Sequence, residues 1–173
     1  MKKKIKPEND FLYMQAALKD GNEILELLTP YINQKILIPR SIEQIEKGIK
    51  NTWIAKSREN KIVATASIIF FSNNLCEIRA LVVDKKYQSK NVGKNLITQI
   101  ISFLTENYPT PLQIFALTYA VEFFKKIGFT VVSKSKFPDK IYEDCKFCLK
   151  QETCDETAVE MLIKKKDESV RRK

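Results

Sequence analysis

The sequence predicts an α+β fold in which helices flank a mixed, mostly antiparallel sheet. Two observations carry this prediction. Apolar residues recur at helical spacing before Thr52 and again from Val92 to Asn107, whereas β-rich runs separated by polar turns fill the stretch from Thr52 to Val83. The chain has 173 residues, of which 44% are hydrophobic, and this suits one ordinary core. We therefore expect a single domain over residues 1–173.

The strands are predicted from short β-rich runs between turn signals. The spacing of the middle runs predicts an antiparallel meander, because the polar turns between them have hairpin length. The expected strands are Leu12–Ala16, Trp53–Lys56, Val63–Phe71, Cys76–Val83, Leu112–Leu117, Phe129–Ser133 and Thr157–Ile163.

The helices are predicted from apolar spacing and from capping residues. Asp20 or Asn22 is expected to cap the first helix, which ends near Pro30 or shortly after it. Ser41 and Gln44 have the spacing of a capping box at the start of a second helix. Two further helices are expected, one from about Val92 to Asn107 and a shorter one from Glu122 to Ile127 that Gly128 closes in a left-handed conformation.

The formal charge of +9 is concentrated at the two ends of the chain. Residues 1–6 carry +4, and residues 164–173 carry six basic residues against two acidic ones, which leaves only +1 between Pro7 and Ile163. We therefore expect basic, flexible tails at residues 1–10 and 164–173 rather than a nucleic-acid surface. No apolar run approaches the roughly 20 residues that a membrane span needs, so we expect no membrane partner and a cytoplasmic location.

The chain contains no histidine, and this restricts its chemistry. A Ser-His or Cys-His dyad, a histidine-ligated metal and an imidazole base are all excluded. Proton transfer in an enzyme of this composition must use a carboxylate, tyrosine, lysine, cysteine or water. Lysine outnumbers arginine by 25 to 5, so the three arginines of the body, Arg40, Arg58 and Arg79, are the more informative cations.

The strand that ends at Val83 carries two charged residues on one face. Strand side chains alternate, so Glu77, Arg79, Leu81 and Val83 are expected on one face and Ile78, Ala80 and Val82 on the other. Charges on an otherwise apolar strand are costly unless they are paired or lie in a cleft. A simple ion pair within the strand is the alternative to a functional site.

The segment after this strand has the character of an anion-binding loop. It contains small residues and leads into the helix at Val92, so free N–H groups at the positive end of a helix dipole would face a phosphate. Lys90 and Lys94 add positive charge. The spacing is neither that of a dinucleotide-binding glycine loop nor that of a Walker loop.

At these residues the sequence resembles a known family. EIRALVV followed by YQSKNVGKNLI resembles the acetyl-CoA motif of the GNAT acetyltransferases, Gln/Arg-x-x-Gly-x-Gly/Ala, in which Gln88 and Gly93 match and Asn91 replaces the first glycine. Asparagine tolerates a left-handed backbone better than most residues. FFKKIGF, from Phe123 to Phe129, resembles the second signature of the family. The order of elements from Leu12 to Ile163 also fits the GNAT fold.

The resemblance implies a cofactor site in the cleft where the fourth and fifth strands of the sheet splay apart. It implies acetyl-CoA as cosubstrate and direct attack of a neutral amine on the thioester. Glu77 is then the candidate base, and Tyr119 is a candidate proton donor that could equally be a packed surface tyrosine. The implied cofactor residues are Leu81, Val82, Val83, Gln88, Ser89, Lys90, Asn91, Val92, Gly93, Lys94 and Phe124.

A narrower resemblance concerns the acceptor. The segments IPRS, EIRAL, LTY and the cysteine-bearing stretch from Phe137 to Glu156 are similar, in this order, to short bacterial amino-acid N-acetyltransferases related to N-acetylglutamate synthase. This implies acetylation of L-glutamate, as in arginine biosynthesis, with Arg40, Arg79 and Thr118 binding the substrate. A peptide, protein or polyamine acceptor is the alternative within the fold. A non-catalytic acetyl-CoA-binding or zinc-dependent interaction module is the alternative from another class.

A loop over residues 136–156 carries three cysteines. Cys145, Cys148 and Cys154, with Asp155 beside them, could hold zinc, but the usual second Cys-x-x-Cys pair is missing, so we favour reduced cysteines without metal. Cys76 is expected in the core rather than as a nucleophile. The sequence leaves open whether the chain forms a homodimer.

Overall fold

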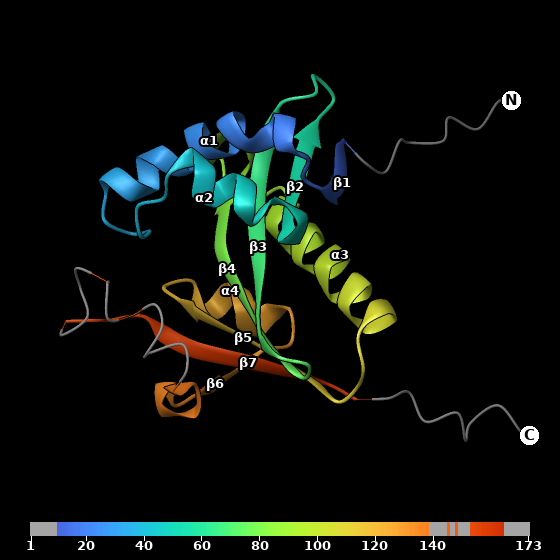
Figure 1. Cartoon of the computed structure of the whole chain (residues 1–173), viewed down its shortest axis with the longest axis vertical. Coiled ribbons are helices and arrows are strands. Elements are labelled where there is room, and N and C mark those ends of the chain that lie inside the picture. The colour runs from blue at the N-terminus through green and yellow to red at the C-terminus, as the bar shows by residue number, and fades with distance from the viewer. Residues whose placement is uncertain (1–9, 139–144, 146–147, 149–152, 165–173) are drawn as a thin grey trace, which may run out of the picture. The chain divides into compact units, whose positions relative to one another are not determined.

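The computed structural model describes residues 10–138, 145, 148 and 153–164. Most of the predicted tail residues and of the cysteine loop lie outside these ranges. Among the described residues, no helix combines the length and the apolar character that crossing a bilayer requires. The elements are labelled in Figure 1. The helices are α1 (Gly21–Asn33), α2 (Ile42–Lys47), α3 (Val92–Asn107) and α4 (Val121–Lys126), and the strands are β1 (Phe11–Gln15), β2 (Thr52–Ser57), β3 (Ile62–Ser72), β4 (Leu75–Val83), β5 (Leu112–Thr118), β6 (Thr130–Val132) and β7 (Thr157–Ile163).

The seven strands form a mixed sheet in the order β1-β2-β3-β4-β5-β7-β6. The pair β4–β5 is parallel, whereas β1–β2, β2–β3, β5–β7 and β6–β7 are antiparallel. The predicted α+β fold with a mixed, mostly antiparallel sheet is therefore confirmed. Helix α3 and strand β7 begin and end at the residues expected from their apolar spacing.

The chain divides into two compact units that interleave along the sequence. The first contains residues 1–67 and 80–100, and the second contains residues 68–79 and 101–173. The division passes through β3, β4 and α3, so neither unit is one continuous segment. The single-domain prediction stays a prediction.

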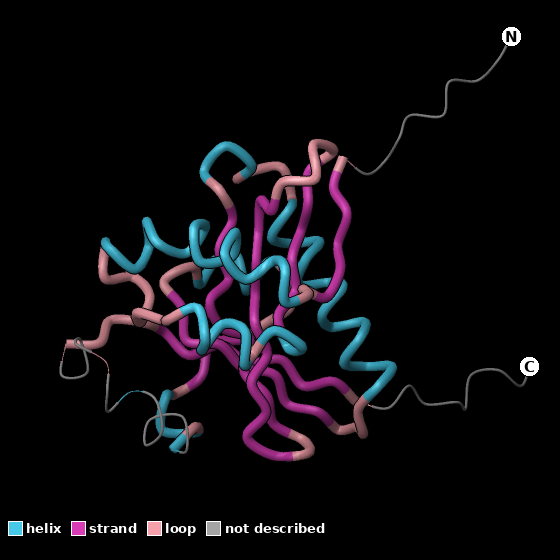
Figure 2. The backbone as a smooth tube through the Cα atoms, turned by 45° about the horizontal axis from the view of Figure 1, so that its top comes forward, coloured by secondary structure: helices cyan, strands magenta, loops and turns pink. Residues whose placement is uncertain are grey.

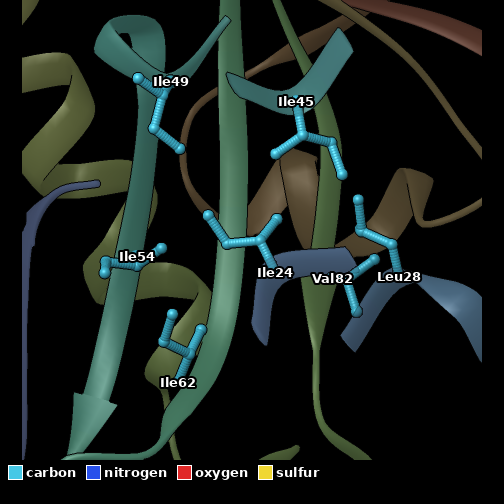
Figure 3. Close-up of a cluster of buried hydrophobic side chains, with 7 residues drawn as sticks. All are labelled: Ile24, Leu28, Ile45, Ile49, Ile54, Ile62 and Val82. Carbon is cyan, nitrogen blue, oxygen red and sulfur yellow. The ribbon is translucent and has the colours of Figure 1, made fainter. Parts of the chain in front are cut away.

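In the first unit, α1 and α2 pack on the strands around an aliphatic core. Strands β1, β2 and β3 run side by side in Figure 2. The core contains seven buried residues, which Figure 3 shows: Ile24, Leu28, Ile45, Ile49, Ile54, Ile62 and Val82. Helix α2 starts at the predicted capping box, in which Ser41 Oγ accepts from the Gln44 N–H and Gln44 Oε1 accepts from the Ser41 N–H.

Asp20 does not cap α1 with its side chain, although it occupies the N-cap position. Its carboxylate accepts instead from Lys56 Nζ at 2.8 Å and from the Ala17 N–H at 2.8 Å. Both partners of this ion pair are buried, with side chains 6% and 9% exposed. Burial by itself would raise the pKa of Asp20, but the bonds from Lys56 and Ala17 and the charge of Lys56 hold this pKa below its ordinary value.

In the second unit, β5 lies between β4 and β7. Its register with β7 runs from Leu112 opposite Ile163 to Thr118 opposite Thr157. Phe115 of β5 is fully buried and stacks on Phe137 with ring centroids 3.9 Å apart. This aromatic pair fixes the segment that follows β6 against the middle of the sheet.

The buried ion pair provides a test of stability. Asp20→Asn leaves the Lys56 ammonium buried without its counterion, so we expect the free energy of unfolding in urea to fall by about 3–5 kcal/mol at pH 7. The matched control is Asp10→Asn, which removes an exposed partner of Arg58 and should change stability little.

The same pair predicts a pH dependence. The folded-state pKa of Asp20 lies below its unfolded value, so the pair stabilises the fold above about pH 4 and loses this contribution as the pH falls through the folded pKa. The difference in unfolding free energy between wild type and Asp20→Asn should therefore shrink from pH 7 towards pH 3. A constant difference over this range would contradict the assignment.

Candidate active site

The parallel pairing of β4 with β5 ends at the candidate base. The ladder joins Leu75, Cys76 and Glu77 to Gln113, Ile114 and Phe115, while β4 continues to Val83. Glu77 is only 2% exposed. A buried carboxylate therefore stands at the last register pair of the ladder, where the resemblance expects the two strands to diverge.

A left-handed residue lies in β4 three positions later. Ala80 has a φ of 52°, which is uncommon for a residue with a side chain and typical of a bulge. Beyond Arg79, Val82 belongs to the buried core of the first unit and Ala80 packs against it. The common face predicted for Glu77, Arg79, Leu81 and Val83 stays a prediction.

Cys76 lies in the core, as expected. Its side chain is fully buried. Burial and the neighbouring charge of Glu77 raise the pKa of the Cys76 thiol to about 12. A thiol with this pKa supplies almost no thiolate at neutral pH, so Cys76 is unsuited to nucleophilic catalysis.

The loop between β4 and α3 has two left-handed residues. Ser89 has a φ of 63° and Asn91 a φ of 59°. The left-handed conformation expected of asparagine at the position of the motif's glycine is confirmed. The Asn91 carbonyl accepts the first helical bond from the Asn95 N–H at 2.9 Å, so Asn91 is the residue at which α3 begins.

This geometry suits a phosphate. The first N–H groups of a helix have no intrahelical acceptor, and those of Val92, Gly93 and Lys94 lie at the positive end of the 16-residue helix α3. Left-handed residues in a loop turn successive N–H groups towards one concavity, as in anion-binding nests. Lys90 Nζ lies 5.3 Å above the Tyr87 ring, and Lys94 is exposed, so two cations border the loop.

The carbonyl of Val83 is already bonded within the protein. The Tyr31 hydroxyl donates to it at 3.0 Å, and the Gln88 side-chain amide donates to it at 3.0 Å. A carbonyl oxygen has two lone pairs, so these two donors fill its capacity. If Val83 contacts the cofactor as predicted, the contact is made by its N–H group. If Gln88 contacts the cofactor as predicted, the contact is made by groups other than its amide nitrogen.

The two candidate substrate arginines lie in different units. Arg40 is half-buried and directly precedes Ser41, the N-cap of α2, in the first unit. Arg79 is half-buried in the part of β4 that belongs to the second unit, two residues after Glu77. The structure thus places Arg79 beside the candidate base along one strand.

Thr118 and Tyr119 follow the end of β5. The Thr118 hydroxyl accepts from the Ala120 N–H at 2.9 Å, so it shapes the turn into α4. Tyr119 is 44% exposed. Partial burial, a hydrogen bond to Asp155 and the charges of Glu156 and Asp155 raise the pKa of Tyr119 to about 12. The Tyr119 hydroxyl therefore remains protonated at neutral pH and is a donor.

Phe124 is not at the surface. It is 2% exposed, and its ring meets those of Phe123 and Phe129 edge to face with centroids 5.3 and 5.1 Å away. Half-buried Phe123 is the more accessible aromatic residue of α4. The cofactor role predicted for Phe124 stays a prediction, and its observed contacts are those of a core residue.

The cysteines do not gather in the described part of the chain. There, no three cysteine or carboxylate side chains lie close enough together to hold a metal ion, and Cys145, Cys148 and Cys154 form no disulfide. Cys154 Sγ lies 3.3 Å from Lys134 Nζ, which also donates to the Cys154 carbonyl at 3.0 Å.

The fold and the loop define a class of protein, and comparison with known proteins agrees. Residues 22–142 match the model of the acetyltransferase (GNAT) domain. The chain belongs to the GNAT acetyltransferase family, and is an acetyl-transferring enzyme with acetyl-CoA as cosubstrate. The left-handed loop at the N-terminus of α3 fits this group, because it presents N–H groups and lysines to a pyrophosphate.

Two known proteins are similar to this chain in sequence. An uncharacterized N-acetyltransferase of Chlorobaculum tepidum is 31% identical over 153 residues, which cover 88% of this chain and 97% of the relative. The amino-acid acetyltransferase of Escherichia coli K12 is 29% identical over 126 residues, or 72% of this chain. The match spans only 28% of that longer protein.

Solved structures share the fold. The N-acetylglutamate synthase of Neisseria gonorrhoeae, complexed with coenzyme A and N-acetyl-glutamate, superposes with a TM-score of 0.78 and 24% identity. The superposition covers 91% of this chain and 36% of that one. A Mycobacterium tuberculosis protein in complex with CoA has a TM-score of 0.73 at 20% identity, with 88% and 99% of the two chains covered.

Sequence reasoning missed two residues that hold the loop between β4 and α3, the cofactor loop. Tyr31 was not expected to reach Val83 and Gln88, because it lies more than 50 residues before them; its only local signal was its place on the buried side of α1 after Leu28. Asp84 is the second of these residues. Its carboxylate accepts from the Lys86 N–H at 2.9 Å and so caps the turn Lys85–Tyr87.

The left-handed residue at position 91 can be tested directly. Asn91→Gly should preserve both stability and the KM for acetyl-CoA, because glycine adopts this φ without strain. Asn91→Val should cost about 1–2 kcal/mol of unfolding free energy, and the altered loop should raise the KM for acetyl-CoA. The control is Asn73→Val in the exposed turn after β3. A harmless Asn91→Val would mean that the loop does not depend on this conformation.

Proposed function

We propose that this enzyme transfers the acetyl group of acetyl-CoA to the α-amine of an amino acid, with L-glutamate as the acceptor. The observation that carries the proposal is the position of buried Glu77 at the last β4–β5 register pair, with Arg79 two residues further along the strand. In this proposal Glu77 is the base and Arg79 is the cation that binds a substrate carboxylate. The proposed location is the cytoplasm, and the proposed pathway is arginine biosynthesis.

The reaction needs a base and a binding site for the donor. An α-ammonium must lose a proton before its nitrogen can attack the thioester carbon. Glu77 accepts this proton, directly or through water, the C–N bond forms, and the C–S bond breaks to release coenzyme A as a thiolate. On forming the amide the attacking nitrogen loses its second proton, and the thiolate takes a proton, for which Tyr119 is our candidate donor. The proton lost by the nitrogen, passed on through water, restores the Tyr119 hydroxyl.

A glutamate acceptor needs partners for two carboxylates. Guanidinium groups bind carboxylates through two parallel hydrogen bonds, which ammonium groups cannot do. We assign this task to Arg79 and Arg40, and a secondary contact to Thr118. The names of the E. coli and Neisseria relatives, which are amino-acid acetyltransferases or N-acetylglutamate synthases, support this choice of acceptor.

A panel of acceptors tests the substrate. The protein is incubated with acetyl-CoA and single amino acids, a tripeptide or spermidine, and the release of free thiol is followed. We expect turnover with glutamate. Arg79→Ala should lower kcat/KM for glutamate by about 10²-fold or more, because it removes a charged partner worth several kcal/mol. Arg58→Ala, at the exposed third arginine of the body, is the matched control. Turnover with spermidine or peptide but with no amino acid would refute the proposal.

The base is tested by an isosteric change. Glu77→Gln should lower kcat by about 10²- to 10⁴-fold while coenzyme A binding is retained. The loss should become smaller as the pH rises, because a growing fraction of the acceptor is then already a free amine. If Glu77→Gln reduces kcat by less than tenfold at neutral pH, Glu77 is not the base.

A further inference from the structure

The hydroxyl of Tyr31, on helix α1, contacts both the end of β4 and the start of the cofactor loop. Its hydroxyl donates to the Val83 carbonyl at 3.0 Å, and the Gln88 amide nitrogen lies 3.5 Å from the same hydroxyl, at the outer limit of a hydrogen bond. The Gln88 amide also donates to the Val83 carbonyl at 3.0 Å. The three groups form a closed triangle that connects helix α1, the end of β4 and the start of the cofactor loop.

The surroundings of Tyr31 make this contact specific. Its ring packs against the buried aliphatic core of the first unit, and this packing fixes the direction in which the hydroxyl points. Burial, and then the charge of Asp84, raise the pKa of the Tyr31 hydroxyl, so it stays protonated and keeps donating. The backbone carbonyl of Tyr31 accepts from the N–H groups of Ile36 and Leu37 at 3.0 and 3.3 Å, which holds the chain reversal after α1.

The triangle lies directly before the left-handed residues of the loop. Gln88 has an extended backbone, with φ −61° and ψ 155°, and the next residue, Ser89, is left-handed. A side chain tied at Gln88 therefore fixes the direction in which the loop leaves β4. A loop with two left-handed residues has an intrinsic cost, and it persists only where its surroundings determine it.

We propose that Tyr31 is a positioning residue for acetyl-CoA binding. Its hydroxyl, together with the Gln88 amide, saturates the Val83 carbonyl, and this holds the loop from Gln88 to Asn91 in the shape that presents its N–H groups to the pyrophosphate. The inference rests on the family's use of acetyl-CoA and holds for any acceptor.

The test is the removal of one oxygen atom. Tyr31→Phe keeps the ring and the backbone bonds, and its dissociation constant for coenzyme A is measured by calorimetry. We expect the dissociation constant to rise about 3- to 10-fold, the range of one lost hydrogen bond. In turnover, the KM for acetyl-CoA should rise by a similar factor, with kcat at saturation unchanged within twofold. The melting temperature should stay within a few degrees of that of wild type.

The controls separate positioning from folding. Tyr108→Phe removes the hydroxyl of a tyrosine that stacks on Phe70 in the second unit and should leave coenzyme A binding unchanged. Gln88→Leu should weaken binding, and Tyr31→Phe in that background should add less than its effect alone, because both groups act on one carbonyl. A dissociation constant within twofold of wild type for Tyr31→Phe, an equal effect of Tyr108→Phe, or full additivity with Gln88→Leu would each overturn the inference.

Discussion

The site depends on one constraint, namely that β4 pairs with β5 over only its first residues. The three register pairs end at Glu77, and the strand continues to Val83. Where a strand continues past its last pair with a neighbour, its N–H and C=O groups on that edge have no partner in the neighbour. Such backbone groups need other partners when they are buried. In a GNAT enzyme an extended ligand can occupy such an edge in the manner of an added strand. The end of the ladder thus sets both the position of the candidate base and the length of β4 that can meet a cofactor.

Two left-handed residues lie near this end of the ladder. Ala80 has a positive φ within β4, directly after Arg79. Asn91 begins α3 at the position where the family motif has glycine. Both residues have a left-handed backbone, which costs free energy in a residue with a side chain. Strained backbone conformations of this kind are common near functional sites. At Asn91 this cost is small because asparagine tolerates it.

The loop is held by side chains from distant segments as well as by its own backbone. Tyr31 from α1 and Gln88 from the loop meet at the carbonyl of Val83, and Asp84 caps the turn between them. Asp20 is another residue whose place in the sequence predicts one contact and whose side chain makes a different one. Its position before α1 is that of a cap, but its carboxylate binds Lys56 on β2. Because both side chains are buried, the attraction between their charges is stronger than that between an exposed carboxylate and the N-terminus of a helix.

The sequence by itself determined the features that rest on local physics. Apolar spacing located α3, a β-rich run located β7, the Ser41–Gln44 spacing located the capping box of α2, and the tolerance of asparagine for positive φ anticipated Asn91. The tertiary structure alone decided the rest: the last pair of the β4–β5 ladder, the left-handed conformation of Ala80, the Tyr31 contact with Val83 and the burial of Phe124. Helical and capping signals act over three or four residues and leave a trace in the residue pattern. Strand divergence and contacts between distant residues depend on how whole elements pack, and no local pattern records them.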